Sequence, residues 1–175
     1  MVLTKTPICN FGEKAHNFNL IGVDGKSYSL EECSGKNGTL IMFICNHCPY
    51  VKAIIKEIVR DTDSLKNLGI NSVAIMSNDT KNYPEDSFDK MKEFSKNNVF
   101  KFPYLIDETQ EIAKKFGAVC TPDFFGYNSN LELQYRGRMR ELKDLRPIGS
   151  GKSDLFSAMK LISESGKGPK EQIPS

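Results

Sequence analysis

Phe43-Ile44-Cys45-Asn46-His47-Cys48-Pro49 joins an apolar run to a helical pattern and carries two cysteines in Cys-x-x-Cys spacing. Residues 39–44 are almost entirely apolar and rich in strand formers, which predicts a strand buried on both faces. After Pro49, apolar residues recur at positions 51, 54, 55, 58 and 59, the spacing of an amphipathic helix. A cysteine pair at such a junction indicates a redox-active dithiol, because the thiols can reach each other and a helix N-terminus stabilises a thiolate.

Composition limits the class of protein. The chain has 175 residues, 39% hydrophobic and 26% charged, which is typical of one globular domain. A net charge of +2 favours neither nucleic acid nor an anionic membrane as a partner. The first ten residues lack the apolar stretch of a secretory signal, and no run is long enough to span a bilayer. Five cysteines, an odd number, fit a reducing compartment, so we expect a cytoplasmic protein.

The remaining patterns predict an α/β sheet with a parallel centre and an antiparallel edge. The Gly-, Lys- and Pro-containing tail 166–175 is expected to be disordered. The predicted elements are a hairpin with a type I′ turn at Asp24-Gly25, strands at 70–76 and 100–106, helices starting at Pro84, Asp107 and Ser153, and a hairpin whose second strand is 131–136.

The dithiol chemistry assigns a role to each residue of the motif. Cys45 is expected at the mouth of the helix as the nucleophile, with Cys48 one turn inside as the resolving thiol. A cationic His47 near Cys45 would stabilise the thiolate and make the disulfide more oxidising, whereas a His47 facing solvent would be a spacer.

Zinc or copper is the competing interpretation of Cys45, His47 and Cys48. A structural zinc usually takes four ligands from two separated pairs, and the sequence has no second such pair. Cys120 could add a third sulfur if the fold brings it close, although a buried inert thiol is the alternative. We expect no metal and no bound cofactor. Cys9 and Cys33 are assigned no role.

Several segments of the chain resemble the peroxiredoxin-like group of the thioredoxin superfamily, which is related to the alkyl hydroperoxide reductase/thiol-specific antioxidant family and carries a Cys-x-x-Cys. These segments are 43–52, 77–79, 83–86, 102–110, 119–125 and 135–138. The resemblance implies a thioredoxin-like fold over residues 1–165, with a central mixed β-sheet flanked by helices and an N-terminal β-hairpin extension. It also implies a cis Pro122 facing the cysteines, with Thr121, Pro122 and Asn46 contacting substrate.

Two departures from the family pattern concern the chemistry. Peroxiredoxins carry Pro-x-x-x-Thr/Ser-x-x-Cys, but counting back from Cys48 gives Cys45 and Ile41, and counting from Cys45 also fails. A peroxide-binding cation would have to come from Arg136 or Arg138, for which a solvated edge-strand position is the alternative. The buried acid of thioredoxin is replaced by Thr39, so proton transfer needs another group or water.

The sequence therefore favours a thiol–disulfide oxidoreductase of antioxidant or redox-homeostasis function. It would act on protein disulfides or thiols and take electrons from a thioredoxin-type donor. One alternative is a thiol peroxidase that reduces hydroperoxides through a sulfenic acid. The other is a non-catalytic redox sensor or metal carrier.

Overall fold

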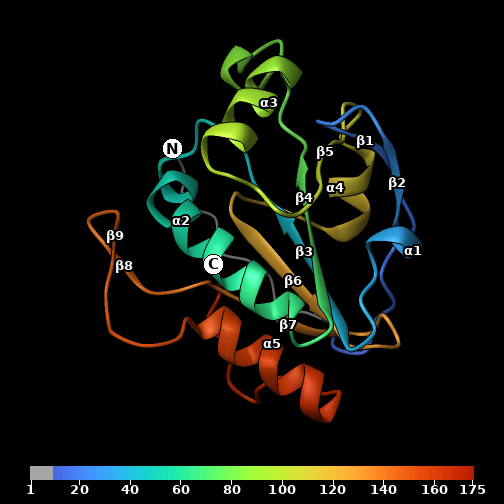
Figure 1. Ribbon diagram of the computed structural model, residues 1–175, viewed down its shortest axis with the longest axis vertical. Coiled ribbons are helices and arrows are strands. Elements are labelled where there is room, and N and C mark those ends of the chain that lie inside the picture. The colour runs from blue at the N-terminus through green and yellow to red at the C-terminus, as the bar shows by residue number, and fades with distance from the viewer. Residues whose placement is uncertain (1–9) are drawn as a thin grey trace.

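A seven-stranded mixed sheet forms the centre of the molecule (Figure 1). The computed structural model describes residues 10–175. The strands are β1 Asn19–Gly22, β2 Ser27–Ser29, β3 Gly38–Phe43, β4 Ile70–Met76, β5 Tyr104–Ile106, β6 Asp123–Tyr127, β7 Leu133–Arg136, β8 Leu142–Lys143 and β9 Arg146–Pro147. The helices are α1 Leu30–Cys33, α2 Pro49–Lys66, the 3₁₀ turn η1 Pro84–Asp86, α3 Phe88–Asn97, α4 Glu111–Phe116 and α5 Asp154–Ser165.

The sheet order is β2-β1-β5-β4-β3-β6-β7, with β8 and β9 forming a separate small hairpin. Strands β3, β4 and β5 run parallel, whereas β6 pairs antiparallel with β3 and β1 pairs antiparallel with β5. The predicted mixed sheet is thus confirmed, and the hairpin β1–β2 extends it at the β5 edge as expected. This topology is that of a thioredoxin-like fold.

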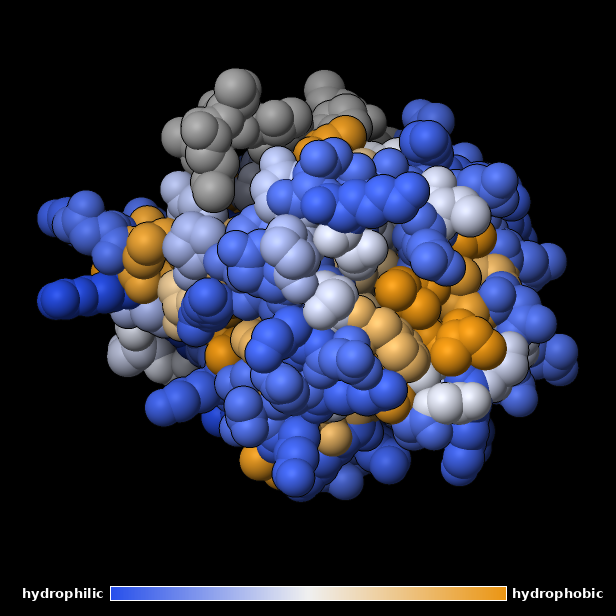
Figure 2. Space-filling view, turned by 90° about the horizontal axis from the view of Figure 1, so that it is seen from above, coloured by the Kyte–Doolittle hydropathy of each residue, from blue (hydrophilic) through white to orange (hydrophobic). Residues whose placement is uncertain are grey.

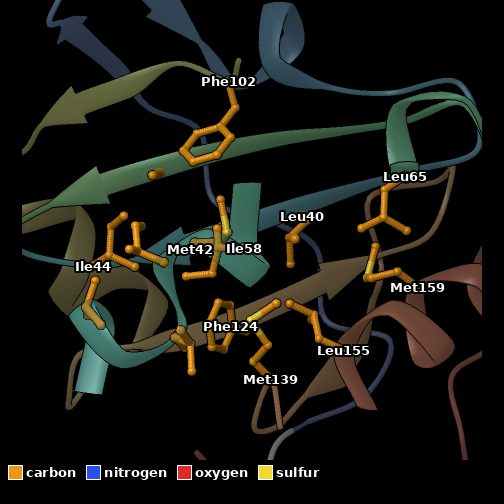
Figure 3. Packing of buried hydrophobic residues seen from close by; sticks show 14 of the residues in the cluster. Leu40, Met42, Ile44, Ile58, Leu65, Phe102, Phe124, Met139, Leu155 and Met159 are labelled. Carbon is orange, nitrogen blue, oxygen red and sulfur yellow. The ribbon is translucent and has the colours of Figure 1, made fainter. Parts of the chain in front are cut away.

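Each face of the sheet carries its own apolar core because side chains alternate along a strand. On one face Leu40 and Met42 of β3 pack with residues of α2 and α5, as Figure 3 shows. On the other face Ile41 and Phe43 pack with residues of α1 and α4. Every residue of β3 is buried, as the apolar run predicts. The central strand therefore holds the motif that follows it between two packed layers.

Helix α2 has the apolar stripe that the sequence predicts, and Ile54, Ile55 and Ile58 on it are buried. Its start differs from the expectation. The helix begins at Pro49 and its N-cap is Cys48, so Cys48 lies at the mouth of the helix and Cys45 precedes it. Proline suits the first helical position because its missing N–H would have no partner there. The position of this proline therefore determines which thiol meets the helix N-terminus.

Two predicted turns form differently. The β1–β2 turn has positive φ at Gly25 and not at Asp24, and the Gly25 N–H donates to the Gly22 carbonyl, which excludes a type I′ turn. Pro84 opens only the short η1 turn, and α3 starts after Ser87. In both places the side-chain preference marks the position of the turn but not its exact form.

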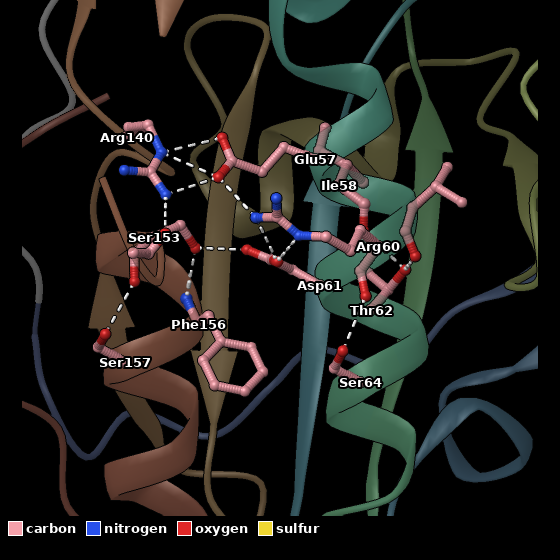
Figure 4. Close-up of polar contacts among 12 residues, drawn as sticks. Glu57, Ile58, Arg60, Asp61, Thr62, Ser64, Arg140, Ser153, Phe156 and Ser157 are labelled. Carbon is pink, nitrogen blue, oxygen red and sulfur yellow. Dashed lines mark hydrogen bonds and ion pairs between the residues drawn. The ribbon is translucent and has the colours of Figure 1, made fainter. Parts of the chain in front are cut away.

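The segment 137–152 and helix α5 are tied to α2 by a polar network (Figure 4). The Glu57 carboxylate accepts from Arg140 at 2.7 Å and from Arg60 at 2.7 Å. Ser153, the N-cap of α5, donates to the buried Asp61 at 2.5 Å. The hairpin β8–β9 extends beyond this network as an arm, seen at the left of Figure 1 and Figure 2, where hydrophobic side chains lie among charged ones. The sequence did not predict this arm.

The tail also differs from its expected disorder, because its residues hydrogen-bond to strand β7 and the segment after it. Gln172 accepts from the Arg136 N–H at 2.9 Å and donates to the Gln134 carbonyl at 2.8 Å. The Ile173 carbonyl accepts from the Arg138 N–H at 2.7 Å. Backbone groups left open along β7 give the polar tail partners that its composition does not reveal.

Candidate active site

Both thiols of the motif contact the same residue on the opposite loop. The Cys45 sulfur lies 3.4 Å from the Thr121 hydroxyl, and the Cys48 sulfur lies 3.2 Å from the Thr121 carbonyl oxygen. The Thr121–Pro122 peptide bond is cis, as the resemblance implies. Strand β3 delivers the cysteines and the start of β6 delivers Thr121, because β3 and β6 are paired. Cys45 is 1% exposed and Cys48 5% exposed, and both are free thiols.

The pKa values of the two thiols are shifted in opposite directions. The pKa of Cys48 is lowered to about 5, chiefly because the Cys45 thiol donates a hydrogen bond to its sulfur, with further bonds from the Val51 and Tyr50 N–H groups. The pKa of Cys45 is raised by its bond to Cys48, by burial and by the charge of Asp86. A protonated Cys48 donates to the Thr121 carbonyl, which opposes ionisation, but the donors around its sulfur outweigh that single acceptor. Cys48 is therefore the more acidic thiol of the pair.

His47 joins the cysteines to a buried acid that the sequence did not single out. Its Nδ1 lies 2.6 Å from Asp86 Oδ2 and 3.8 Å from the Cys45 sulfur. Its ring stacks on Tyr83, with centroids 5.0 Å apart. His47 thus does not face solvent as a spacer. Its Nδ1 is hydrogen-bonded to the Asp86 carboxylate as well as lying near the Cys45 sulfur.

Asp86 lies outside the Cys-x-x-Cys motif and accepts hydrogen bonds from its backbone. It is fully buried, and its Oδ1 accepts from the Asn46 N–H at 2.8 Å and from the His47 N–H at 3.2 Å. Its Oδ2 also accepts from the Asn78 side chain at 2.8 Å. Asp86 comes from η1, about forty residues beyond the motif, so local sequence could not link them. An acidic residue in the 3₁₀ turn after Pro84 was the only sequence signal.

Asn46 has a structural position. Its side chain accepts from the Tyr104 hydroxyl at 2.9 Å and donates to the Glu85 carbonyl at 3.0 Å. It is 6% exposed. The expected substrate contact would need the Asn46 side chain to face the surface, and here it faces the protein interior.

A cleft of about 630 Å³ opens beside the pair. Cys48 lines it and Cys45 does not. Other residues around it are His47, Tyr50, Tyr83, Thr121, Pro122 and Met139. Hence Cys48 is the thiol of the pair that faces the cleft, and Thr121 and Pro122 line the same cleft.

The other cysteines and the arginines are also located. Cys120 lines the cleft, and burial followed by the charge of Asp123 raises its pKa to about 12. Cys33 lies in the core on the far face of the sheet, and Cys9 lies outside the described residues. Arg136 is not a solvated edge residue: it is 8% exposed and pairs with the buried Asp123 at 2.8 Å.

Arg138 and Arg140 line the cleft, yet both are held by carboxylates. Arg138 pairs with Asp154 at 2.7 Å, and Arg140 pairs with Glu57. Within residues 10–175, the hydrogen bonds of these two guanidinium groups go to carboxylates and to the Gly151 carbonyl, and not to a cysteine sulfur.

The fold and this dithiol site define a thiol redox protein of the thioredoxin superfamily. Residues 11–141 match the AhpC/TSA family. The chain belongs to that family.

Two solved structures are similar over nearly the whole chain. An uncharacterized conserved protein from Geobacillus kaustophilus is 38% identical, with a TM-score of 0.93 over 100% of this chain and 93% of that one. A hypothetical protein from Sinorhizobium meliloti is 31% identical, with a TM-score of 0.90 over 99% of this chain and 94% of that one.

More distant structures share the fold. The peroxidoxin BcpB from Mycobacterium tuberculosis is 16% identical, with a TM-score of 0.62 over 87% of this chain and 94% of that one. No curated protein matches the chain. Among the helices of residues 10–175, none has both the length and the apolar character needed to cross a bilayer.

Proposed function

We propose that this protein is a thiol–disulfide oxidoreductase in which Cys48 attacks and Cys45 resolves. The observation that carries the proposal is the position of Cys48 at the N-cap of α2, facing the cleft, with helix N–H groups on its sulfur. A thiolate is the nucleophile of thiol exchange, and a helix N-terminus favours it. These roles are the reverse of those that the sequence predicts.

The reaction proceeds in two exchanges. The Cys48 thiolate attacks a substrate disulfide, a mixed disulfide forms, and the first substrate sulfur leaves as a thiolate. Cys45 then loses its proton and attacks the Cys48 sulfur, which forms the Cys45–Cys48 disulfide and releases the second substrate thiolate. Two electrons pass to the substrate. Another dithiol protein of thioredoxin type restores the pair, and a reducing compartment such as the cytoplasm suits this cycle.

The Cys45 proton is proposed to pass to the departing substrate thiolate or to water. His47 Nδ1 lies 3.8 Å from the Cys45 sulfur but carries the proton that it donates to Asp86, so it is not the acceptor. Thr121 and Pro122 are proposed to contact the substrate chain beside Cys48. Cys120 lines the same cleft, but its raised pKa makes it a poor nucleophile at neutral pH.

Trapping distinguishes the two assignments of the thiols. The variants Cys45→Ser and Cys48→Ser, each in a Cys9→Ser/Cys120→Ser background, are incubated with a peptide disulfide and separated by mass. If Cys48 attacks, Cys45→Ser accumulates the mixed disulfide and Cys48→Ser forms none. The opposite pattern would restore Cys45 as the nucleophile, and no adduct with either variant would remove thiol exchange as the function. The background protein with both thiols is the control.

A peroxidase is the second candidate, supported by the family match and by the lowered pKa of Cys48. Here the Cys48 thiolate would take the terminal oxygen of a hydroperoxide, giving a sulfenic acid and an alcohol. Cys45 would then condense with it, forming the disulfide and releasing water. Mixing the reduced protein with hydrogen peroxide tests this reaction. A rate of disulfide formation no greater than that of a free dithiol would exclude it.

A further inference from the structure

Three different ligand types converge beside the dithiol. The Cys45 sulfur, His47 Nδ1 and Asp86 Oδ2 all lie within 4.8 Å of one another. Cys45 and Asp86 are buried and His47 is half-buried. One sulfur, an imidazole nitrogen and a carboxylate oxygen therefore surround one point.

These atoms are spaced as ligands of a small tetrahedral ion would be before it binds. Zinc holds sulfur at about 2.3 Å and nitrogen or oxygen at about 2.0–2.2 Å, which sets neighbouring ligand atoms roughly 3.3–3.6 Å apart. The sulfur–nitrogen distance here is 3.8 Å and the nitrogen–oxygen distance is 2.6 Å. When the ion binds, the sulfur–nitrogen distance must shorten slightly. The nitrogen–oxygen distance must widen by under about 1 Å, because the ion replaces the proton shared by His47 and Asp86.

The ligands have the second layer of contacts that metal sites need. Asp86 Oδ1 is held by two backbone N–H groups of the motif, and Asn78 donates to Oδ2. Tyr83 stacks on the His47 ring. Contacts of this kind orient ligands and raise metal affinity. These contacts hold the ligand side chains in place.

We propose that the reduced protein binds one Zn²⁺ through Cys45, His47 and Asp86, with a water molecule as the fourth ligand. Thiolate and imidazole select against magnesium and calcium, and the carboxylate favours zinc over monovalent copper. Binding replaces the Cys45 thiol proton and the proton shared by His47 Nδ1 and Asp86, and both pass to solvent. The sequence leaves such a site one ligand short, because Asp86 comes from η1.

One consequence concerns regulation of the dithiol. A sulfur that has joined a disulfide is no longer a thiolate ligand, so the ion and the Cys45–Cys48 disulfide exclude each other. Zinc would therefore hold the protein reduced and inactive in thiol exchange. This consequence, unlike the binding itself, rests on the proposed function.

Binding is measured on the full chain with a Cys9→Ser/Cys120→Ser background, first reduced and then freed of reductant and metal. Zn²⁺ is titrated against a coloured chelator, and Co²⁺ serves as an optical probe of the ligands. We expect one Zn²⁺ per chain, together with cobalt–thiolate charge-transfer bands and intense tetrahedral d–d bands. The protein oxidised to the Cys45–Cys48 disulfide should show neither.

Matched variants separate this site from binding by the two thiols alone. His47→Gln and Asp86→Asn should each weaken zinc binding at least tenfold, whereas His16→Gln and Asp89→Asn, changed away from the site, should not. If Asp86→Asn does not fold, His47→Gln decides, because that side chain is partly exposed. Absence of binding, or full affinity in His47→Gln, would overturn the site. Thiol exchange measured with chelator present tests the proposed function separately.

Discussion

Replacing Asp86 with Asn should destabilise the reduced protein by about 3 kcal/mol. The carboxylate is fully buried and accepts hydrogen bonds on both oxygens. Asparagine keeps one oxygen for the Asn46 and His47 N–H groups but presents an NH₂ group to His47 Nδ1 and to the Asn78 amide. Two hydrogen bonds to an anion, each worth about 1.5–3 kcal/mol, are lost, and the smaller desolvation cost of the neutral side chain offsets part of that.

Equilibrium unfolding in guanidinium chloride, with a thiol reductant and a chelator present, measures this change. The control is Asp89→Asn, because the Asp89 side chain is 88% exposed and pairs with Lys92 on the surface of α3. It should change the free energy of unfolding by no more than about 0.5 kcal/mol. If Asp86→Asn is as stable as this control, then Asp86 does not hold the motif, and the reasoning about the site fails.

Three further outcomes are expected. The rate at which iodoacetamide alkylates Cys48 should rise with pH around a midpoint of about 5, because only the thiolate reacts. Cys45→Ala should raise this midpoint, because it removes the main hydrogen-bond donor to the Cys48 sulfur. A midpoint near 8.5 in the protein with both thiols would contradict the assignment. Arg136→Met should lower the free energy of unfolding by about 3–5 kcal/mol, since it leaves Asp123 buried without its partner, while adding Asp123→Leu should recover part of the loss in the same denaturation assay. Ile58→Ala should cost about 2–5 kcal/mol and Ile58→Val only about 0.5–1.5, because Ile58 is fully buried against the sheet (Figure 3), and equal costs would contradict that packing.

Elements that depend on residues close together in the chain could be predicted from the sequence. The apolar run became β3 because every one of its side chains is buried, and the stripe after Pro49 became α2 because its isoleucines face the sheet. Helix α5 started where it was predicted, at Ser153, whose hydroxyl accepts from the Phe156 N–H within the same turn. In each case the residues that decide the structure lie within a few positions of one another.

Errors of detail arose where the backbone had several acceptable forms. Asp24-Gly25 is compatible with more than one hairpin turn, and Pro84 can begin either a helix or a 3₁₀ turn. The tail 166–175 has the composition of a disordered segment, yet the open edge of β7 offers it hydrogen bonds. Composition cannot reveal such a partner.

The sequence by itself determined that two thiols stand at the junction of a buried strand and a helix, because hydrophobic periodicity and the Cys-x-x-Cys spacing are local properties. Only the tertiary structure decided which thiol faces the cleft, and it alone brought Asp86 to His47. Those features depend on contacts across some forty to seventy residues of chain. The acidity of a buried sulfur depends on the donors and charges that folding places around it.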